Sequence, residues 1–181
     1  FREQLPYFRV LLDAYGIKYY ELLHYEADDI LGTLAKAADP DDQVMIVSGD
    51  KDLTQLASDQ VTVYITKKGV SELEPYTPSS IWDKYQLTPQ QIIDLKGLMG
   101  DSSDNYPGIE RVGEKTALKL LHQFGTVEGL YQGLDQLKPS KMKENIIRDE
   151  ANARLSKSLD RIVQDAPLEI TLDDCQLGQR D

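Results

Sequence analysis

The chain has 181 residues, enough for one substantial domain or for a core with a smaller attached module. Its 40% hydrophobic content is typical of a globular protein, and no apolar run approaches the roughly 20 residues that cross a bilayer. The single Cys175 excludes an internal disulfide and a thiolate metal site, so we expect a reducing, cytoplasmic setting. The formal net charge of −11 argues by itself against a nucleic-acid partner.

The first part of the chain alternates helical and extended patterns. It begins with apolar residues at helical spacing, which predict a helix, and Gly16 is the predicted C-terminal end of that helix. The uninterrupted apolar run at 43–49 is typical of a parallel strand buried on both faces. This alternation predicts an α/β core with a mostly parallel sheet over residues 1–76. The predicted elements are helices at 1–16, 27–38 and 52–58, strands at 17–22, 43–49 and 61–66, and a hairpin or edge strand at 67–76.

Residues 77–181 have a different character, because no convincing strand appears before about Val163. Thr77 and Thr88 each precede a proline, which predicts two helices with a threonine N-cap and proline at the first helical position. The tail from residue 167 is predicted to be a peripheral strand with a loose end. The sequence therefore predicts an all-helical segment, with further helices at 114–124, 126–134, 139–149 and 151–163.

Seven carboxylates form three tight clusters along the chain. Like charges so close together repel one another, which suggests that a cation gathers them. Oxygen ligands without His or Cys suit Mg²⁺ or Mn²⁺, so a two-metal site for phosphoryl chemistry is the first hypothesis. The alternative is that these acids only favour helix N-termini or lie in a solvated loop. The clusters are Glu26, Asp28 and Asp29; Asp50 and Asp52; and Asp101 and Asp104.

A short hairpin that opens into a helix, at about 106–124, is a candidate phosphate-binding element. Gly108 permits close backbone approach, and Gly113 leads into a helix N-terminus whose free N–H groups can hold a phosphate. Residues 106–161 carry ten basic and eight acidic side chains, a mild basic excess. Such a site reads the backbone of a duplex and not its sequence. An ordinary capped helix is the alternative. The polar residues that would assist are Lys115, Thr116 and Lys119.

Three motifs in this order and spacing, EADD, GDKDLTQL and GDSSDNYPGIERVGEKTA, resemble the structure-specific 5′ nucleases, or flap endonucleases. This family includes the N-terminal 5′-3′ exonuclease domains of bacterial DNA polymerases, and the resemblance spans residues 1–172. It implies a Rossmann-like (PIN-like) core, a helix–hairpin–helix module and two Mg²⁺ or Mn²⁺ ions. It also implies hydrolysis of DNA at 5′ flaps, nicks and gaps and of RNA primers, in replication and repair. We expect a monomer in the bacterial cytoplasm, fused to a polymerase region.

The resemblance also assigns roles by position. Glu26, Asp28 and Asp50 resemble ligands of one metal. Asp52 and Asp104 resemble ligands of the second, and these five would be catalytic. Asp29 and Asp101 would contribute directly or through water. The residues that resemble contacts to the duplex backbone are Gly108, Gly113, Lys115 and Thr116.

Two departures from the family pattern matter. Arg111 stands where the family usually carries glycine; it either strains the hairpin and spoils a monovalent cation site there or supplies a substitute phosphate contact. The chain also begins at Phe1 inside a predicted helix, whereas the family has a further aspartate-bearing strand and a basic helical arch before this point. We therefore expect a sheet without its central strand and a poorly active fragment.

Two alternatives to an active nuclease are a non-catalytic duplex- or junction-binding module and a hydrolase of small phosphate esters.

Overall fold

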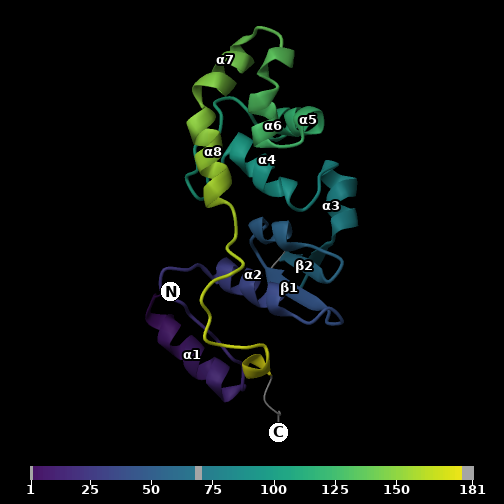
Figure 1. The fold of residues 1–181 in the computed structure, drawn as a ribbon. Helices are drawn as coiled ribbons and strands as arrows, with labels where there is room; N and C mark the ends of the chain where they lie inside the picture. Colours follow the sequence, from purple (N-terminus) through teal and green to yellow (C-terminus); the bar gives the residue numbers. More distant parts are fainter. Residues whose placement is uncertain (1, 68–70, 177–181) are drawn as a thin grey trace. The chain divides into compact units, whose positions relative to one another are not determined.

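The computed structural model describes residues 2–67 and 71–176 (Figure 1). The chain divides into two compact units. The first unit comprises residues 1–39 and 163–181, and the second comprises residues 40–162. Our predicted boundary between residues 76 and 77 stays a prediction. Within the described ranges, no helix is long and apolar enough to span a membrane.

Within its described residues, the first unit contains two helices and two short 3₁₀ turns. The predicted first helix is confirmed, and Gly16 follows it with φ of 64°. The predicted strand at 17–22 is wrong: a strand needs a partner, and the described chain pairs none with it. The predicted tail strand is also wrong for the residues up to 176. In that segment the Asp174 carboxylate accepts the Thr171 N–H at 2.8 Å and stabilises a turn instead. Residues 177–181 lie outside the description. The elements are η1 (Arg2–Gln4), α1 (Leu5–Ala14), α2 (Ala27–Ala37) and η4 (Asp173–Cys175).

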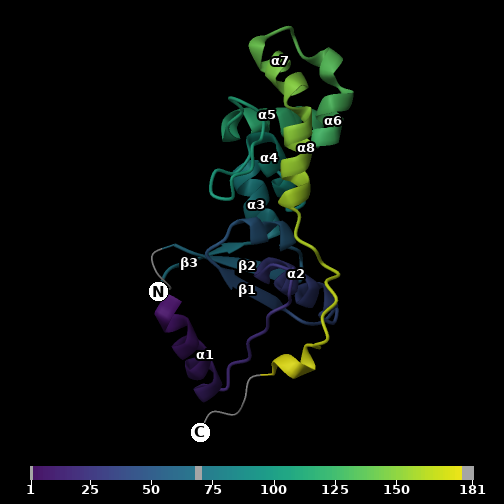
Figure 2. The ribbon, with the colours of Figure 1, turned by 90° about the vertical axis from the view of Figure 1, so that its left-hand side faces the viewer.

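The second unit opens with a three-stranded mixed sheet, whose strands lie side by side in Figure 2. Strands β1 (Val44–Ser48) and β2 (Val61–Thr66) are parallel, and β3 (Leu73–Tyr76) is antiparallel to β2. This confirms both predicted strands and, at Leu73–Tyr76, the predicted addition after β2; residues 68–70 of that prediction lie outside the description. Burial of β1 on both faces is wrong, because Met45 is 70% exposed and only Ile46 is buried in this edge strand.

Helices make up the rest of the second unit. The Thr77 hydroxyl caps α3 by accepting the Ser80 N–H at 3.2 Å, as predicted. Thr88 is not a cap: α4 begins later, and the Thr88 N–H donates to Gln91 Oε1 at 2.9 Å. The last helix ends before the predicted Val163. The elements are α3 (Pro78–Tyr85), α4 (Gln91–Met99), α5 (Glu114–Phe124), α6 (Val127–Gln132), η3 (Leu134–Gln136), α7 (Lys141–Arg148) and α8 (Glu150–Leu159).

Helix α4 connects the helical module, residues 77–162, to the end of the sheet. It packs along α8 and against η2 (Asp52–Leu56), the 3₁₀ turn that replaces the predicted helix after β1. Gly97 allows the close approach of α4 and α8, because a Cβ there would lie 2.8 Å from Lys157 Cβ. The residue before it, Lys96, is thereby held close to the carboxylate that begins η2.

Candidate metal centre and nucleic-acid interface

Three carboxylates of the second unit gather where η2 meets the loop after α4. Asp52, Asp101 and Asp104 each place one carboxylate oxygen within 4.8 Å of the others. The loop closes on itself through backbone hydrogen bonds of 3.2 and 2.7 Å between Asp101 and Tyr106. An all-oxygen set suits a hard cation. These three residues could therefore hold one such ion.

A lysine of α4 lies between two of these carboxylates. Lys96 Nζ lies 2.6 Å from Asp52 Oδ1 and pairs with Asp101, and all three side chains are less than one-fifth exposed. Burial alone would lower the pKa of Lys96, but hydrogen bonds with Asp101 and Asp52 raise that pKa above its ordinary value. The bond from Lys96 lowers the pKa of Asp101, whereas burial raises the pKa of Asp52. The Lys96 ammonium thus offsets part of the negative charge that Asp52 and Asp101 bring to the site.

Asp160 is a further acid at this place that we did not predict. It follows α8, is only 5% exposed, and neither carboxylate oxygen has a hydrogen-bond partner in the described ranges. Its carbonyl accepts a 2.8 Å hydrogen bond from the Gln55 amide of η2. Burial, followed by the negative charge of Asp52, raises the pKa of Asp160 to about 8. The sequence offered one signal, since a negative charge at a helix C-terminus is unfavourable.

The other predicted ligands lie beside this cluster or in the first unit. Asp50 is exposed, and its Oδ1 accepts the Asp52 N–H at 2.9 Å. In the first unit, Glu26 precedes α2, and its N–H donates to Asp29 Oδ2 at 3.0 Å. Asp29 Oδ1 also accepts the Val163 N–H at 2.8 Å, while Asp28 lies in the first turn of α2. The assignment of these four residues as ligands stays a prediction.

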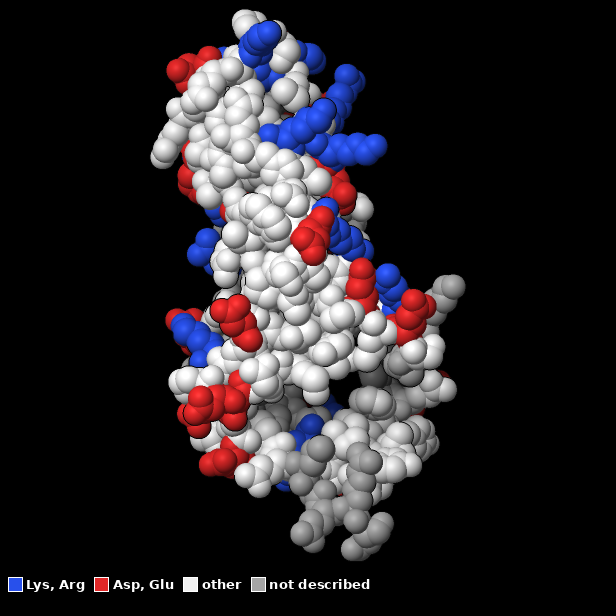
Figure 3. Space-filling view, turned by 90° about the vertical axis from the view of Figure 1, so that its right-hand side faces the viewer, with Lys and Arg blue, Asp and Glu red and all other residues white. Residues whose placement is uncertain are grey.

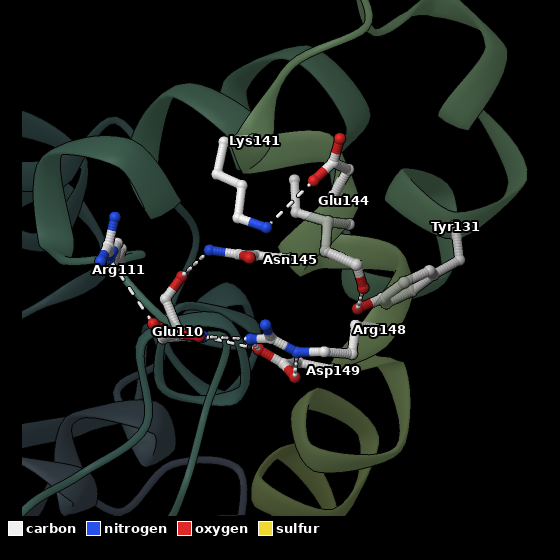
Figure 4. Close-up of polar contacts among 9 residues, drawn as sticks. Glu110, Arg111, Tyr131, Lys141, Glu144, Asn145, Arg148 and Asp149 are labelled. Carbon is white, nitrogen blue, oxygen red and sulfur yellow. Dashed lines mark hydrogen bonds and ion pairs between the residues drawn. The ribbon is translucent and has the colours of Figure 1, made fainter.

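The hairpin at 109–112 is clamped by the end of α7 (Figure 4). The Glu110 N–H donates to Asp149 at 2.9 Å, and the Asn145 amide donates to the Glu110 carbonyl at 3.1 Å. Arg148 bridges Glu110 and Asp149 at 2.6 and 2.7 Å. Its hydrogen bond lowers the pKa of Asp149 to about 2. Both backbone polar groups of Glu110 are thus hydrogen-bonded to side chains at the end of α7.

Two predicted hairpin residues have roles that differ from simple DNA contacts. Gly108 is buried with φ of 52°, and a Cβ there would meet Gly100 N at 2.3 Å. Position 108 must therefore be glycine, because the backbone passes so close to Gly100. A direct contact between Gly108 and DNA stays a prediction. Arg111 has φ of 64° at the third position of the turn, where glycine is favoured. A side chain is disfavoured in this conformation, and the Arg111 side chain is 77% exposed, so both predicted alternatives for Arg111 stay predictions.

The helix after the hairpin presents an open N-terminus. Gly113 precedes α5 without a side-chain cap, and nothing lies within 4 Å of where its Cβ would be. Lys115 and Lys119 are exposed and Thr116 is half-buried, while Glu114 places one negative charge in the first turn. Figure 3 shows lysine and arginine side chains gathered over the helical module, towards the top of the view. The hairpin and α5 can therefore accept a phosphate.

Two substitutions at Arg111 separate its strain from its charge. We expect Arg111→Gly to raise the free energy of unfolding by about 1 kcal/mol, because glycine tolerates positive φ. Arg111→Ala keeps the Cβ and should leave stability within about 0.5 kcal/mol of the parent. Urea denaturation of the two variants measures the difference. Equal stabilities would show that the turn is not strained by its side chain.

Comparison with known proteins places the whole chain in one family. Residues 1–86 match the family model of the 5′-3′ exonuclease N-terminal resolvase-like domain, and residues 87–181 match that of the 5′-3′ exonuclease C-terminal SAM fold. DNA polymerase I of Bacillus caldotenax is 57% identical over 173 residues, and that of Bacillus subtilis is 56% identical over 171 residues. These matches cover 95% and 94% of the chain but only 20% and 19% of the relatives, so the chain spans about a fifth of their length.

A solved structure shares the fold. The T5 5′-exonuclease with bound divalent zinc ions aligns with a TM-score of 0.72 at 25% identity, covering 88% of this chain and 60% of that one. This agrees with the α/β core and helical module predicted from the sequence. The two family models together match every residue. The chain therefore belongs to the 5′-3′ exonuclease family.

Proposed function

We propose that the chain carries the nuclease function of this family, hydrolysing DNA phosphodiesters at 5′ flaps, nicks and gaps with divalent cations. The observation that carries the proposal is the convergence of Asp52, Asp101 and Asp104 within 4.8 Å, in a chain whose every residue matches 5′-3′ exonuclease models. The T5 5′-exonuclease, which shares the fold, is described with divalent metal ions bound. These two facts support metal-dependent hydrolysis over passive DNA binding.

The chain's own residues would prepare the reaction by charge and position. Asp52, Asp101 and Asp104 would hold one ion, and Asp50, Glu26 and Asp28 are the predicted additions to the set. Two Mg²⁺ or Mn²⁺ ions would supply an activated water and stabilise both oxygens of an in-line displacement. The oxygen-only ligands favour these hard cations. A side-chain nucleophile is then unnecessary.

The hairpin and α5 would hold the duplex at a distance from the chemistry. The α5 N-terminus offers N–H groups to a phosphate, and Lys115 and Lys119 add positive charge nearby. Arg111, exposed at the tip of a clamped hairpin, would contact a neighbouring phosphate in place of a monovalent cation. Such contacts carry no base specificity, which suits an enzyme that recognises the ends and branches of DNA.

The setting of this activity follows from the relatives. Because the chain spans about a fifth of the length of the DNA polymerase I proteins that it matches, we propose that it acts joined to a polymerase region. Removal of RNA primers in the bacterial cytoplasm, by a monomer, would be its task. A 5′-labelled flap duplex and a nicked duplex with an RNA 5′ segment test this, with Mg²⁺, Mn²⁺ or EDTA. Short 5′ products that need the ion would support the proposal, and cleavage in EDTA would contradict it.

The proposed contact between Lys115 and a DNA phosphate can be tested separately. We expect Lys115→Ala to weaken binding of flap DNA and to reduce the slope of log K against log salt by about 1, because one phosphate contact is lost. Fluorescence anisotropy in EDTA between low and moderate salt measures both. Lys36→Ala removes an exposed lysine outside the helical module and should leave the slope unchanged. Identical slopes for the two variants would remove Lys115 from the interface.

A further inference from the structure

The carboxylate cluster is already paired with a cation from the protein itself, the ammonium group of Lys96. Lys96 Nζ pairs with Asp52 at 2.6 Å and with Asp101, two of the three residues whose oxygens converge. A divalent ion on those oxygens would stand next to the ammonium, and the two like charges would repel in a site with little solvent. Loading of the ion therefore requires that Lys96 leave Asp52 and Asp101.

A second acceptor for this ammonium lies in the same unit. Asp160 is 5% exposed, and both of its carboxylate oxygens lack a hydrogen-bond partner in the described ranges. Gln55, three residues after Asp52, ties its backbone to η2, and the charges of Asp52, Lys96, Asp101 and Asp50 act on its carboxylate. A buried carboxylate without a partner is costly, and this one has capacity for at least two hydrogen bonds.

The backbone around Asp160 keeps it in place. Its N–H donates to the Ser156 carbonyl at 3.0 Å, and its carbonyl accepts the Gln55 amide at 2.8 Å. The Gln55 Oε1 in turn accepts the Ile162 N–H at 3.0 Å, so Gln55 fastens the chain on both sides of residue 161. Gln55 belongs to η2, which begins at Asp52. The acceptor is thus tied to the same turn as the ligand that the lysine must leave.

We propose that Asp160 is a positioning residue that receives the Lys96 ammonium when a divalent cation takes Asp52 and Asp101. The inference rests on the proposed function, because it assumes that this cluster binds such an ion. Lys96 remains charged and inside the site in both arrangements. Asp160 does not touch the ion in this arrangement. It lowers the free energy that is needed for Lys96 to leave Asp52 and Asp101.

Binding of Mn²⁺, counted by electron paramagnetic resonance of the free ion, tests the proposal without an activity assay. In the protein as its organism produces it, Asp160→Asn should weaken Mn²⁺ binding about 10-fold, the effect typical of a partner that orients ligands. In a Lys96→Met background the same substitution should change affinity less than about 2-fold, since no ammonium then needs an acceptor. Lys96→Met alone should bind the ion at least as tightly as the parent protein.

Matched controls and the other outcomes keep the inference separate from the proposed function. Asp165→Asn removes an exposed carboxylate five residues away. Lys157→Met breaks a second, partly buried lysine cluster, in which Lys157 pairs with Asp94 and Glu128 at 2.6 Å each. Neither substitution should alter Mn²⁺ affinity. A loss with Asp160→Asn in both lysine backgrounds would make Asp160 a direct ligand and overturn its acceptor role. No loss in either background would overturn it as well. Failure of the parent protein to bind Mn²⁺ would instead remove the proposed function.

A second measurement covers variants that fold poorly. The ammonium signal of Lys96 in the parent protein, followed by nitrogen-15 NMR, should shift on addition of Mg²⁺ and stay protected from solvent exchange, because the group moves to a buried acceptor. The Lys157 ammonium should not shift. An ammonium that becomes exposed to rapid exchange when Mg²⁺ binds would show that Lys96 leaves the site, which contradicts the proposal.

Discussion

Asp104→Asn is expected to reduce the single-turnover rate of flap cleavage at least about 100-fold while DNA affinity stays within 2-fold of the parent protein. The side chain is exposed, so its replacement should not disturb the fold. Its carboxylate is one of three that converge within 4.8 Å, and the loss of one ionised ligand weakens the hold on the ion. Metal-assisted hydrolysis gains several kcal/mol from charge stabilisation, and each 1.4 kcal/mol corresponds to about tenfold in rate.

The matched control for this prediction is Asp83→Asn. It removes an exposed aspartate of α3 that belongs to no cluster, and its cleavage rate should equal that of the parent. Cleavage is measured with saturating DNA and Mg²⁺, and affinity is measured by anisotropy in EDTA. If Asp104→Asn cleaves at the parental rate, the loop carboxylates do not serve the reaction.

Local rules predicted most of the helices and the strands of the sheet. The Thr77–Pro78 pair predicts both the cap and the first turn of α3. These features depend on neighbouring residues, which the sequence displays directly. The carboxylate motifs likewise identified three residues that the fold brings together, although they lie up to 52 positions apart.

Features that depend on distant contacts were missed or wrong. The segment 17–22 has the composition of a strand, but a strand exists only where a partner supplies hydrogen bonds. Thr88–Pro89 satisfies the same rule as Thr77–Pro78, yet α4 begins two residues later, at Gln91, whose side-chain amide donates to the distant Gly125 carbonyl at 2.8 Å. Lys96 and Asp160 carry no motif. Their place in the cluster arises because α4 packs on α8 and η2 together.

Asp160 also gives the protein a stability that should fall as the pH rises. Burial, and after it the negative charges of Asp52, Asp101 and Asp50, raise the pKa of Asp160 from 3.8 to about 8, whereas the positive charge of Lys96 opposes this rise. Between these two values the folded protein holds a proton that the unfolded chain has released, so raising the pH favours unfolding. The full shift of about four units corresponds to a loss of up to about 5 kcal/mol, and relaxation around the charge will reduce it.

Asp160→Asn should remove this dependence. The difference in free energy of unfolding between Asp160→Asn and the parent, measured with urea in EDTA, should be near zero at about pH 4 and favour the variant increasingly towards pH 8. Carboxylates with lowered pKa values, such as Asp101 and Asp149, lose their stabilisation only as the pH falls, so they act below this window and cancel in the difference. The exposed control Asp165→Asn should give a flat difference. A flat difference for Asp160→Asn would mean that its carboxylate is already ionised when folded, with Lys96 as its partner before any divalent ion arrives.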